Sequence, residues 1–196
     1  GCEPFSSLLR LSNLKMYKYD WIWEKTVAGN FVNAHNAPLK KHENISVFSL
    51  GTIANKSQRR MKYFPQGLKE INYHYKRPKL YLSDHDGGHL RKSRKTDRII
   101  QYGNYPSSVL KFNSEHNPPH PTQKPVALFE YLINTYTQPG EIVLDNCIGS
   151  GTTAVAALNT GRFFIGIEKE PKYCEIARRR VEQAQMQQSL FEVVTT

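Results

Sequence analysis

The feature that most constrains the fold is a glycine turn between two apolar runs. Residues 142–144 (Ile-Val-Leu) precede the turn at 145–153, and residues 154–158 (Ala-Val-Ala-Ala-Leu) follow it. The first run has the length of a short buried strand, and the second continues as a helix. Gly149 and Gly151 would let the backbone pass close to a ligand, while the helix start offers N–H groups and a positive dipole end. The stretch therefore predicts a nucleotide-type site.

The turn also fits the dinucleotide-binding pattern G-x-G-x-x-G/A. Gly149, Gly151 and Ala154 occupy its small-residue positions, and Glu168 stands at about the right distance downstream. No Lys follows the glycines, which excludes the phosphate loop of nucleoside triphosphatases. A nicotinamide dinucleotide stays an open alternative, although we expect the stretch after Glu168 to be too short for a second nucleotide-binding half.

Helices and strands alternate around this turn. Residues 126–137 place apolar side chains on one helical face, with Pro125 at the first position. Gly161 suits the end of the helix after the turn, residues 162–168 predict the next strand, and Pro171 opens a further helix. The order helix, strand, helix, strand, helix implies right-handed crossovers and a parallel sheet. We therefore expect a Rossmann-like α/β fold.

The first 51 residues predict a smaller antiparallel unit. A helix is expected after Pro4, and the alternating aromatic run 17–23 predicts a half-buried strand. Residues 44–51 form the next strand candidate, and we expect the two strands to pair. Residues 26–39 read as the loop between them.

Positive charge is concentrated in the middle of the chain. The formal net charge is +10, and residues 52–113 hold 14 of the 27 Lys and Arg against 4 of the 17 Asp and Glu. Hydrophobic periodicity fails there, and tyrosines are interleaved with the cations, which offers stacking surfaces beside phosphate contacts. A nucleic-acid-binding segment is favoured over a solvated charged face. The candidate contact residues are Arg59, Arg60, Lys62, Lys76, Arg77, Lys79, Arg91, Lys92, Arg94, Lys95 and Arg98.

Other functional classes find little support. Cys2, Cys147 and Cys174 are odd in number and share no C-x-x-C spacing, so neither a disulfide framework nor a zinc knuckle is indicated. Residues 84–89 (Asp-His-Asp-Gly-Gly-His) contain metal-binding types, but the paired glycines favour a turn, and we predict no metal. No run approaches the length of a membrane span, and no signal pattern opens the chain, so a cytoplasmic location is expected.

Three motifs in a fixed order carry a family resemblance. Residues 120–125 (His-Pro-Thr-Gln-Lys-Pro) come first, the glycine turn within 143–153 second, and residues 164–168 (Phe-Ile-Gly-Ile-Glu) third, followed by Tyr173 and residues 177–180 (Ala-Arg-Arg-Arg). In this order they resemble the amino-methylating DNA methyltransferases of the permuted type. In that type the catalytic half precedes the cofactor half, and a target-recognition segment lies between them.

The resemblance covers the whole chain and implies four regions. Residues 1–51 would end the catalytic half, 52–113 would be the target-recognition insert, 114–184 the half that binds S-adenosylmethionine, and 185–196 a C-terminal tail. Residues 21–25 (Trp-Ile-Trp-Glu-Lys) and His42-Glu43 match the family segment before target recognition. The fold implied is a partial Rossmann-like methyltransferase sheet with an irregular basic insert.

The same resemblance assigns the cofactor contacts. The glycine turn would wrap S-adenosylmethionine, the two threonines after it would cap the helix, and Glu168 would bind the ribose hydroxyls. Asp145 would lie near the methionine amino group, with residues 120–124 closing over the methionine portion. The family usually has Pro-Phe where this chain has Asn146-Cys147. The expected cofactor-binding residues are His120, Pro121, Thr122, Gln123, Lys124, Asp145, Gly149, Ser150, Gly151, Thr152, Thr153 and Glu168.

The family's catalytic tetrapeptide, Asp/Ser/Asn-Pro-Pro-Tyr, does not occur in this sequence. In the family it presents the exocyclic amino group of an extruded base to the methyl donor. In the permuted order it would lie before residue 1, so we expect no catalytic residue in this chain. Residues 117–120 (Asn-Pro-Pro-His) imitate the motif, but they abut the cofactor-closing segment and follow no apolar strand. The chain is then either a fragment of a longer enzyme or a remnant that does not methylate by itself.

The implied function is site-specific methyl transfer from S-adenosylmethionine to duplex DNA within restriction–modification, with adenine N6 favoured over cytosine N4. The alternative is a non-catalytic remnant that binds DNA or a sliding clamp. Residues 187–191 (Gln-Gln-Ser-Leu-Phe) resemble the clamp-docking peptide of bacterial proteins, although Leu190 and Phe191 could instead pack on the domain. A homodimer and a bacterial or phage origin are further expectations, and no membrane partner is expected.

Overall fold

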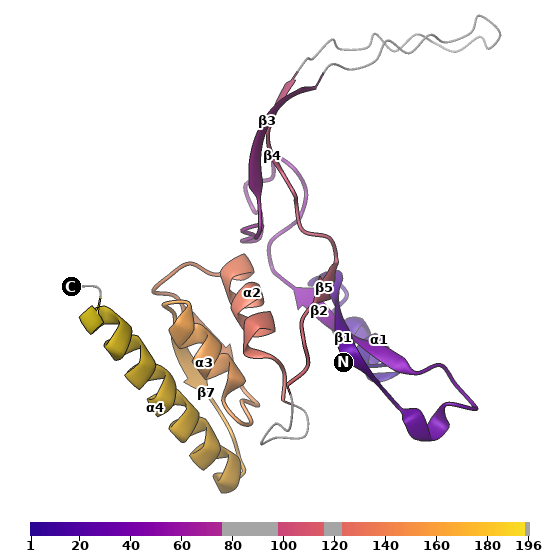
Figure 1. Cartoon of the computed structure of the whole chain (residues 1–196). Helices are drawn as coiled ribbons and strands as arrows, with labels where there is room; N and C mark the ends of the chain where they lie inside the picture. The colour runs from indigo at the N-terminus through magenta and orange to yellow at the C-terminus, as the bar shows by residue number, and fades with distance from the viewer. Residues whose placement is uncertain (76–97, 116–122, 195–196) are drawn as a thin grey trace, which may run out of the picture. The chain divides into compact units, whose positions relative to one another are not determined.

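The computed structural model describes residues 1–75, 98–115 and 123–194, with side chains except at Arg98 and residues 190–194 (Figure 1). The chain divides into two compact units. Gly1–Phe64 and Ser107–Thr196 form the first, and Pro65–Pro106 form the second. The sequence motifs at 84–89 and 117–120 lie outside the described residues.

The first unit begins with a helix and a three-stranded sheet. α1 (Phe5–Ser12) precedes β1 (Tyr17–Gly29), and the short 3-10 helix η1 (Phe31–Asn33) leads to β2 (Lys40–Phe48). β1 pairs antiparallel with β2, as predicted, and parallel with β5 (Val109–Lys111), which gives the order β2-β1-β5. β1 is longer than expected, because residues 26–29 continue the strand that we placed in a loop.

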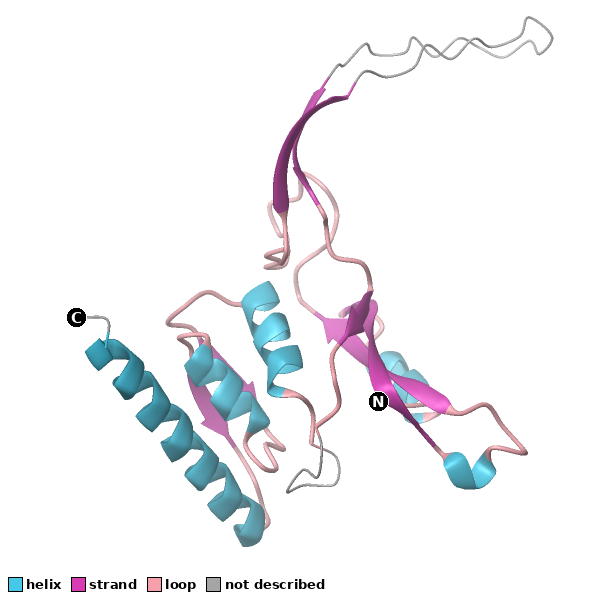
Figure 2. Ribbon diagram, in the orientation of Figure 1, coloured by secondary structure: helices cyan, strands magenta, loops and turns pink. Residues whose placement is uncertain are grey.

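The same unit continues with the predicted alternation of helices and strands (Figure 2). The elements are α2 (Val126–Tyr136), β6 (Ile142–Asp145), α3 (Thr152–Asn159), β7 (Phe163–Gly166) and α4 (Pro171–Val194). β6 and β7 pair in parallel, from Ile142 opposite Phe163 to Asp145 opposite Gly166. The α/β character and the parallel pairing of these strands are confirmed.

Two apolar clusters hold the first unit together. Trp21, Trp23 and Leu110 of the three-stranded sheet pack with Leu128 of α2. On the other side of α2, Ile133 packs with Ala156 and Ala157 of α3, and Val143 and Phe164 of the parallel strands join this second cluster. α2 therefore contacts both sheets through its two faces.

One face of the β6–β7 pair is covered and the other is open. Val143 and Phe164 face the helices, whereas the alternate side chains of Ile142, Leu144 and Phe163 are 62%, 64% and 67% exposed. Parallel strands are usually buried on both faces, which explains why these exposed positions are apolar.

The second unit contains an antiparallel pair that the sequence analysis did not predict. β3 (Lys69–Tyr75) pairs with β4 (Arg98–Gly103), with an irregularity between Glu70 and Tyr73. Ile71, Tyr73 and Tyr75 alternate with polar residues, and this was the available signal. Because charged residues surround this short alternation, we predicted no strand there.

α4 corrects the expected C-terminal tail. The helix runs to Val194, so residues 185–194 continue it, and the clamp-like residues 187–191 lie within it. Among the described helices, none is both long and apolar enough to cross a membrane.

Candidate functional site

The glycine turn connects the end of β6 to the start of α3. Gly149 and Gly151 have φ angles of 53° and 84°, in the left-handed region that glycine adopts at no steric cost. The N–H of Gly151 donates to the carbonyl of Ile148 at 3.0 Å, and the N–H of Ile148 donates to the carbonyl of Ile167 at 3.1 Å. The turn is therefore fastened to the segment that follows β7.

Two carboxylates stand at the carboxyl ends of the adjacent parallel strands. Asp145 accepts hydrogen bonds from the N–H of Cys147 at 2.9 Å and from the Thr153 hydroxyl. Glu168 accepts bonds from the N–H groups of Gly149 at 2.9 Å and Glu170 at 3.0 Å. Both carboxylates are thus oriented by the chain itself, at the edge where open α/β sheets bind their ligands.

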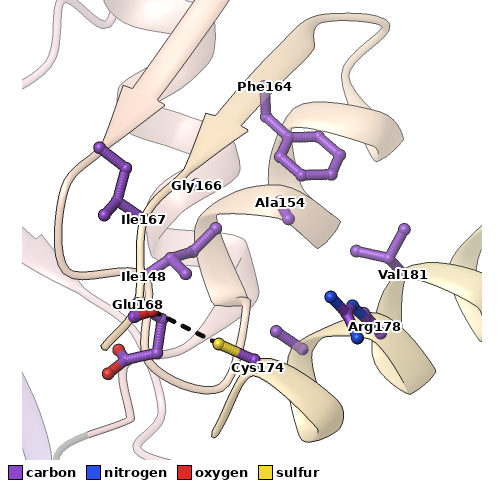
Figure 3. Close-up of a pocket in the computed structure, with 10 residues that line it drawn as sticks. Ile148, Ala154, Phe164, Gly166, Ile167, Glu168, Cys174, Arg178 and Val181 are labelled. Atoms are coloured by element: carbon purple, nitrogen blue, oxygen red, sulfur yellow. Dashed lines mark hydrogen bonds between the residues drawn. The ribbon is translucent and has the colours of Figure 1, made fainter. Parts of the chain in front are cut away.

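A pocket of about 390 Å³ adjoins Glu168 (Figure 3). Ile148, Phe164 and Val181 supply apolar walls, and Glu168 is among the lining residues. The Cys174 thiol donates to the backbone carbonyl of Glu168 at 3.4 Å, and this bond connects α4 to the segment after β7. The volume of the pocket is in the range of small-molecule sites, and its apolar lining is typical of them.

One expectation about the turn is wrong. We predicted that Thr152 and Thr153 cap α3, but its N-cap is Gly151, without a side-chain cap, and the Thr153 hydroxyl bonds Asp145 instead. We also predicted that the glycines allow close ligand approach, and this stays a prediction. A Cβ at Gly151 would lie 2.9 Å from the Cβ of Ala177, so the close packing of α4 is a second reason for a glycine at this position.

Arg180 of α4 joins segments that are distant in sequence, and no sequence pattern predicted these contacts. Its Nη1 donates to the Ser150 carbonyl at 2.8 Å, the Ser150 hydroxyl at 3.2 Å, the Gln123 Oε1 at 3.2 Å and the Thr152 hydroxyl at 3.3 Å. The Ser150 hydroxyl also donates to Gln123 Oε1 at 2.6 Å. Burial lowers the pKa of Arg180, against an opposing effect of Glu115, but a guanidinium stays charged.

Lys124 is held by a different element. Its Nζ lies 3.7 Å from the Glu43 carboxylate of β2, which also pairs with Lys25 of β1 at 2.5 Å. Burial acts to raise the pKa of Glu43, but the bond from Lys25 and the charges of both lysines outweigh it and lower that pKa. The nitrogen of Lys25 also lies 5.2 Å from the centre of the Trp23 ring. No sequence signal placed Glu43 beside Lys124.

The predicted DNA contacts are only partly described. Arg59 and Arg60 are exposed, whereas Lys62 forms an ion pair with Glu141. Arg98 lies in β4, without a described side chain. The predicted residues outside the described ranges are Lys76, Arg77, Lys79, Arg91, Lys92, Arg94 and Lys95 of the basic set and His120, Pro121 and Thr122 of the cofactor set. Within the described residues, no group of three or more His, Cys, Asp or Glu could hold a metal.

The geometry defines a class: an α/β protein in which a glycine turn and two strand-end carboxylates lie at the carboxyl edge of a parallel strand pair. The chain matches the DNA methylase family model N6_N4_Mtase over residues 6–179. It therefore belongs to this family of DNA methylases.

Individual relatives agree with this assignment. The Type II methyltransferase M2.DpnII of Streptococcus pneumoniae is 52% identical over 63 residues, which span 32% of this chain and 24% of that protein. M.BglI of Bacillus subtilis is 53% identical over 66 residues, or 34% of this chain and 19% of that protein. These matches span less than two thirds of either curated relative.

Solved structures share the fold. The M1.HpyAVI–SAM complex matches 91% of this chain and 70% of its own, with a TM-score of 0.56 and 26% identity. The cytosine-N4-specific PvuII DNA methyltransferase matches 90% of this chain and 55% of its own, with a TM-score of 0.55. Because the sequence identity is only 17%, this match shows a shared fold and nothing more.

Proposed function

We propose that the chain supplies the cofactor-binding and DNA-recognition parts of an S-adenosylmethionine-dependent DNA amino-methyltransferase. The observation that carries the proposal is the pair of oriented carboxylates, Asp145 and Glu168, beside the glycine turn of a DNA methylase family member. The solved M1.HpyAVI relative is a SAM complex, which supports the same cofactor here.

The residues present fit this cofactor chemically. S-adenosylmethionine carries ribose hydroxyls and an ammonium group, and carboxylates accept hydrogen bonds from both. It also carries a purine, which an apolar pocket accommodates. Glu168 would accept bonds from the ribose hydroxyls, and Asp145 would accept them from the ammonium group. The pocket beside Glu168 would receive the base. When bound, the cofactor supplies an electrophilic methyl group on a sulfonium.

We propose duplex DNA as the methyl acceptor, with adenine N6 favoured and cytosine N4 as the alternative. Support comes from the family and from the positive charge of residues 52–113, since phosphate contacts dominate the affinity of DNA-binding proteins. Such an enzyme would act on DNA in the bacterial cytoplasm. If the segment contacts phosphates, DNA binding falls steeply with added salt, and a flat response would contradict this role.

A methyl-transfer assay tests the proposal. The chain is incubated with duplex DNA and cofactor labelled on the methyl group, alone and with a segment carrying the family's Pro-Pro-Tyr tetrapeptide supplied in trans. We expect transfer only with the added segment, and nucleoside analysis then separates N6-methyladenine from N4-methylcytosine. Transfer by the chain alone would show that the tetrapeptide is dispensable.

The second candidate is a non-catalytic remnant that binds DNA or a sliding clamp. It is favoured by the clamp-like residues 187–191. These residues lie in α4, so binding as an extended peptide would require the end of the helix to open. If the chain is such a remnant, we expect no methyl transfer even with the added segment. A peptide of residues 183–196 that fails to bind the clamp at high micromolar concentration excludes the clamp role.

A further inference from the structure

We propose that Arg180 is a positioning residue that fastens Gln123 to the glycine turn, so that the stretch 123–124 is fixed before any ligand binds. This inference rests on the proposed function in one respect: the stretch would border an S-adenosylmethionine site. The contacts themselves are independent of that function.

Four acceptors converge on one nitrogen of Arg180. Nη1 of Arg180 has two hydrogens, and its acceptors come from Gln123, Ser150 and Thr152. The shortest contact, 2.8 Å to the Ser150 carbonyl, is the best hydrogen bond, while the others at 3.2–3.3 Å share the remaining donor capacity. A charged donor strengthens each of these bonds relative to a neutral one.

Gln123, Ser150 and Arg180 form a closed arrangement of hydrogen bonds. Gln123 Oε1 accepts from both the Ser150 hydroxyl and the Arg180 guanidinium. Two donors facing this atom agree with its assignment as the amide oxygen. Ser150 and Thr152 are only 3% and 6% exposed, so water competes poorly for the bonds of the cluster.

Lys124, the residue after Gln123, has a different anchor. Gln123 is tied to the turn and α4, whereas the adjacent Lys124 pairs with Glu43 of β2. Two consecutive residues are thus held by different elements of the first unit, Gln123 by the turn and α4 and Lys124 by β2. The stretch 123–124 has two anchors, so loss of one anchor releases one of its residues.

The test combines amide hydrogen exchange with cofactor titration. Arg180→Met keeps much of the aliphatic length but removes the donors and the charge. We expect faster exchange in peptides covering residues 123–126 and 148–153, with unchanged exchange in β1. Arg180→Lys, which restores a charge and a donor, is expected to give intermediate rates. Arg179→Met is the matched control, because Arg179 is exposed and its guanidinium pairs with Glu175 one turn away.

Calorimetry adds the ligand-dependent outcome. We expect Arg180→Met to raise the Kd for S-adenosylmethionine about tenfold, or 1.4 kcal/mol, and Arg179→Met to leave it unchanged. A purely structural role would lower stability without this change in Kd of the folded protein. If Arg180→Met loosens the whole protein, Gln123→Leu removes the acceptor without altering α4, and local exchange should still rise.

The outcomes separate this inference from the proposed function. Unchanged exchange at 123–126 in both folded variants overturns the positioning role of Arg180, whatever ligand the protein binds. Faster local exchange with no binding of S-adenosylmethionine by the unmodified protein supports the fastening and rejects the proposed cofactor.

Discussion

Gly151→Ala probes the packing of the glycine turn against α4. A Cβ at position 151 would lie 2.9 Å from the Cβ of Ala177 and 3.0 Å from its Cα, which is backbone and cannot rotate away. The φ of 84° adds strain of about 1–2 kcal/mol for any residue with a Cβ. Overpacking adds about 1–3 kcal/mol. We therefore expect a loss of about 2–5 kcal/mol in the free energy of unfolding.

Gly140→Ala is the matched control. Gly140 has a similar φ of 81°, but nothing lies within 4 Å of the Cβ it would gain. Both substitutions restrict the unfolded chain equally, so that contribution cancels in the comparison. The difference between the variants isolates the contact with Ala177 and is expected to be about 1–3 kcal/mol.

Urea unfolding at neutral pH measures the difference. For a slope of about 2 kcal/mol per molar urea, the midpoint of Gly151→Ala should lie about 0.5–1.5 M below that of Gly140→Ala. Adding Ala177→Gly should recover part of the loss, although it weakens α4 by about 1 kcal/mol. Equal midpoints for the two single variants would refute the proposed packing of the turn on α4.

Three further predictions concern buried or half-buried polar groups. Tyr136→Phe removes the hydroxyl that accepts the Trp21 indole N–H at 2.5 Å, and it should cost about 1–3 kcal/mol in urea unfolding; no loss would contradict this bond. Buried Arg162 donates to the Thr137 hydroxyl at 3.0 Å and carbonyl at 2.7 Å, so Arg162→Lys, which lacks the planar fork, should destabilise nearly as much as Arg162→Met in thermal unfolding. Full thermal stability in Arg162→Lys would show that a positive charge alone is sufficient at this position. Glu43 has a lowered pKa, so its stabilisation is present above the usual value of 4.5 and is lost as the pH falls through the folded-state value. The free energy of unfolding, measured from pH 7 to 3, should therefore decline less steeply with falling pH in Glu43→Gln than in the unmodified chain. Identical pH profiles would contradict the pairing of this carboxylate.

The parts of the fold that were predicted depend on local patterns. Residues 142–144 are apolar and end in a glycine turn, and this signal suffices for a strand followed by a helix. The pairing of β6 with β7 followed from the alternation of elements around that turn. The partnership of β1 and β2 followed from their alternating side chains. In each case the deciding residues lie close together in sequence.

The parts that were missed depend on distant contacts or on misleading polarity. Arg180 meets Gln123 across 57 positions, and no spacing rule relates them. The polar residues after 185 favoured a tail, yet Gln, Met and Glu are good helix formers, and α4 continues through them. The packing role of Gly151 was missed because Ala177, the residue that leaves no room for a side chain there, belongs to another helix.

The most direct test of the account is calorimetric titration of the chain with S-adenosylmethionine and, separately, with NAD. We predict one S-adenosylmethionine site, weakened at least tenfold in Glu168→Ala, and no detectable binding of NAD. Glu175→Ala, on the exposed side of α4, should bind like the unmodified chain. Binding of NAD without binding of S-adenosylmethionine would contradict the account.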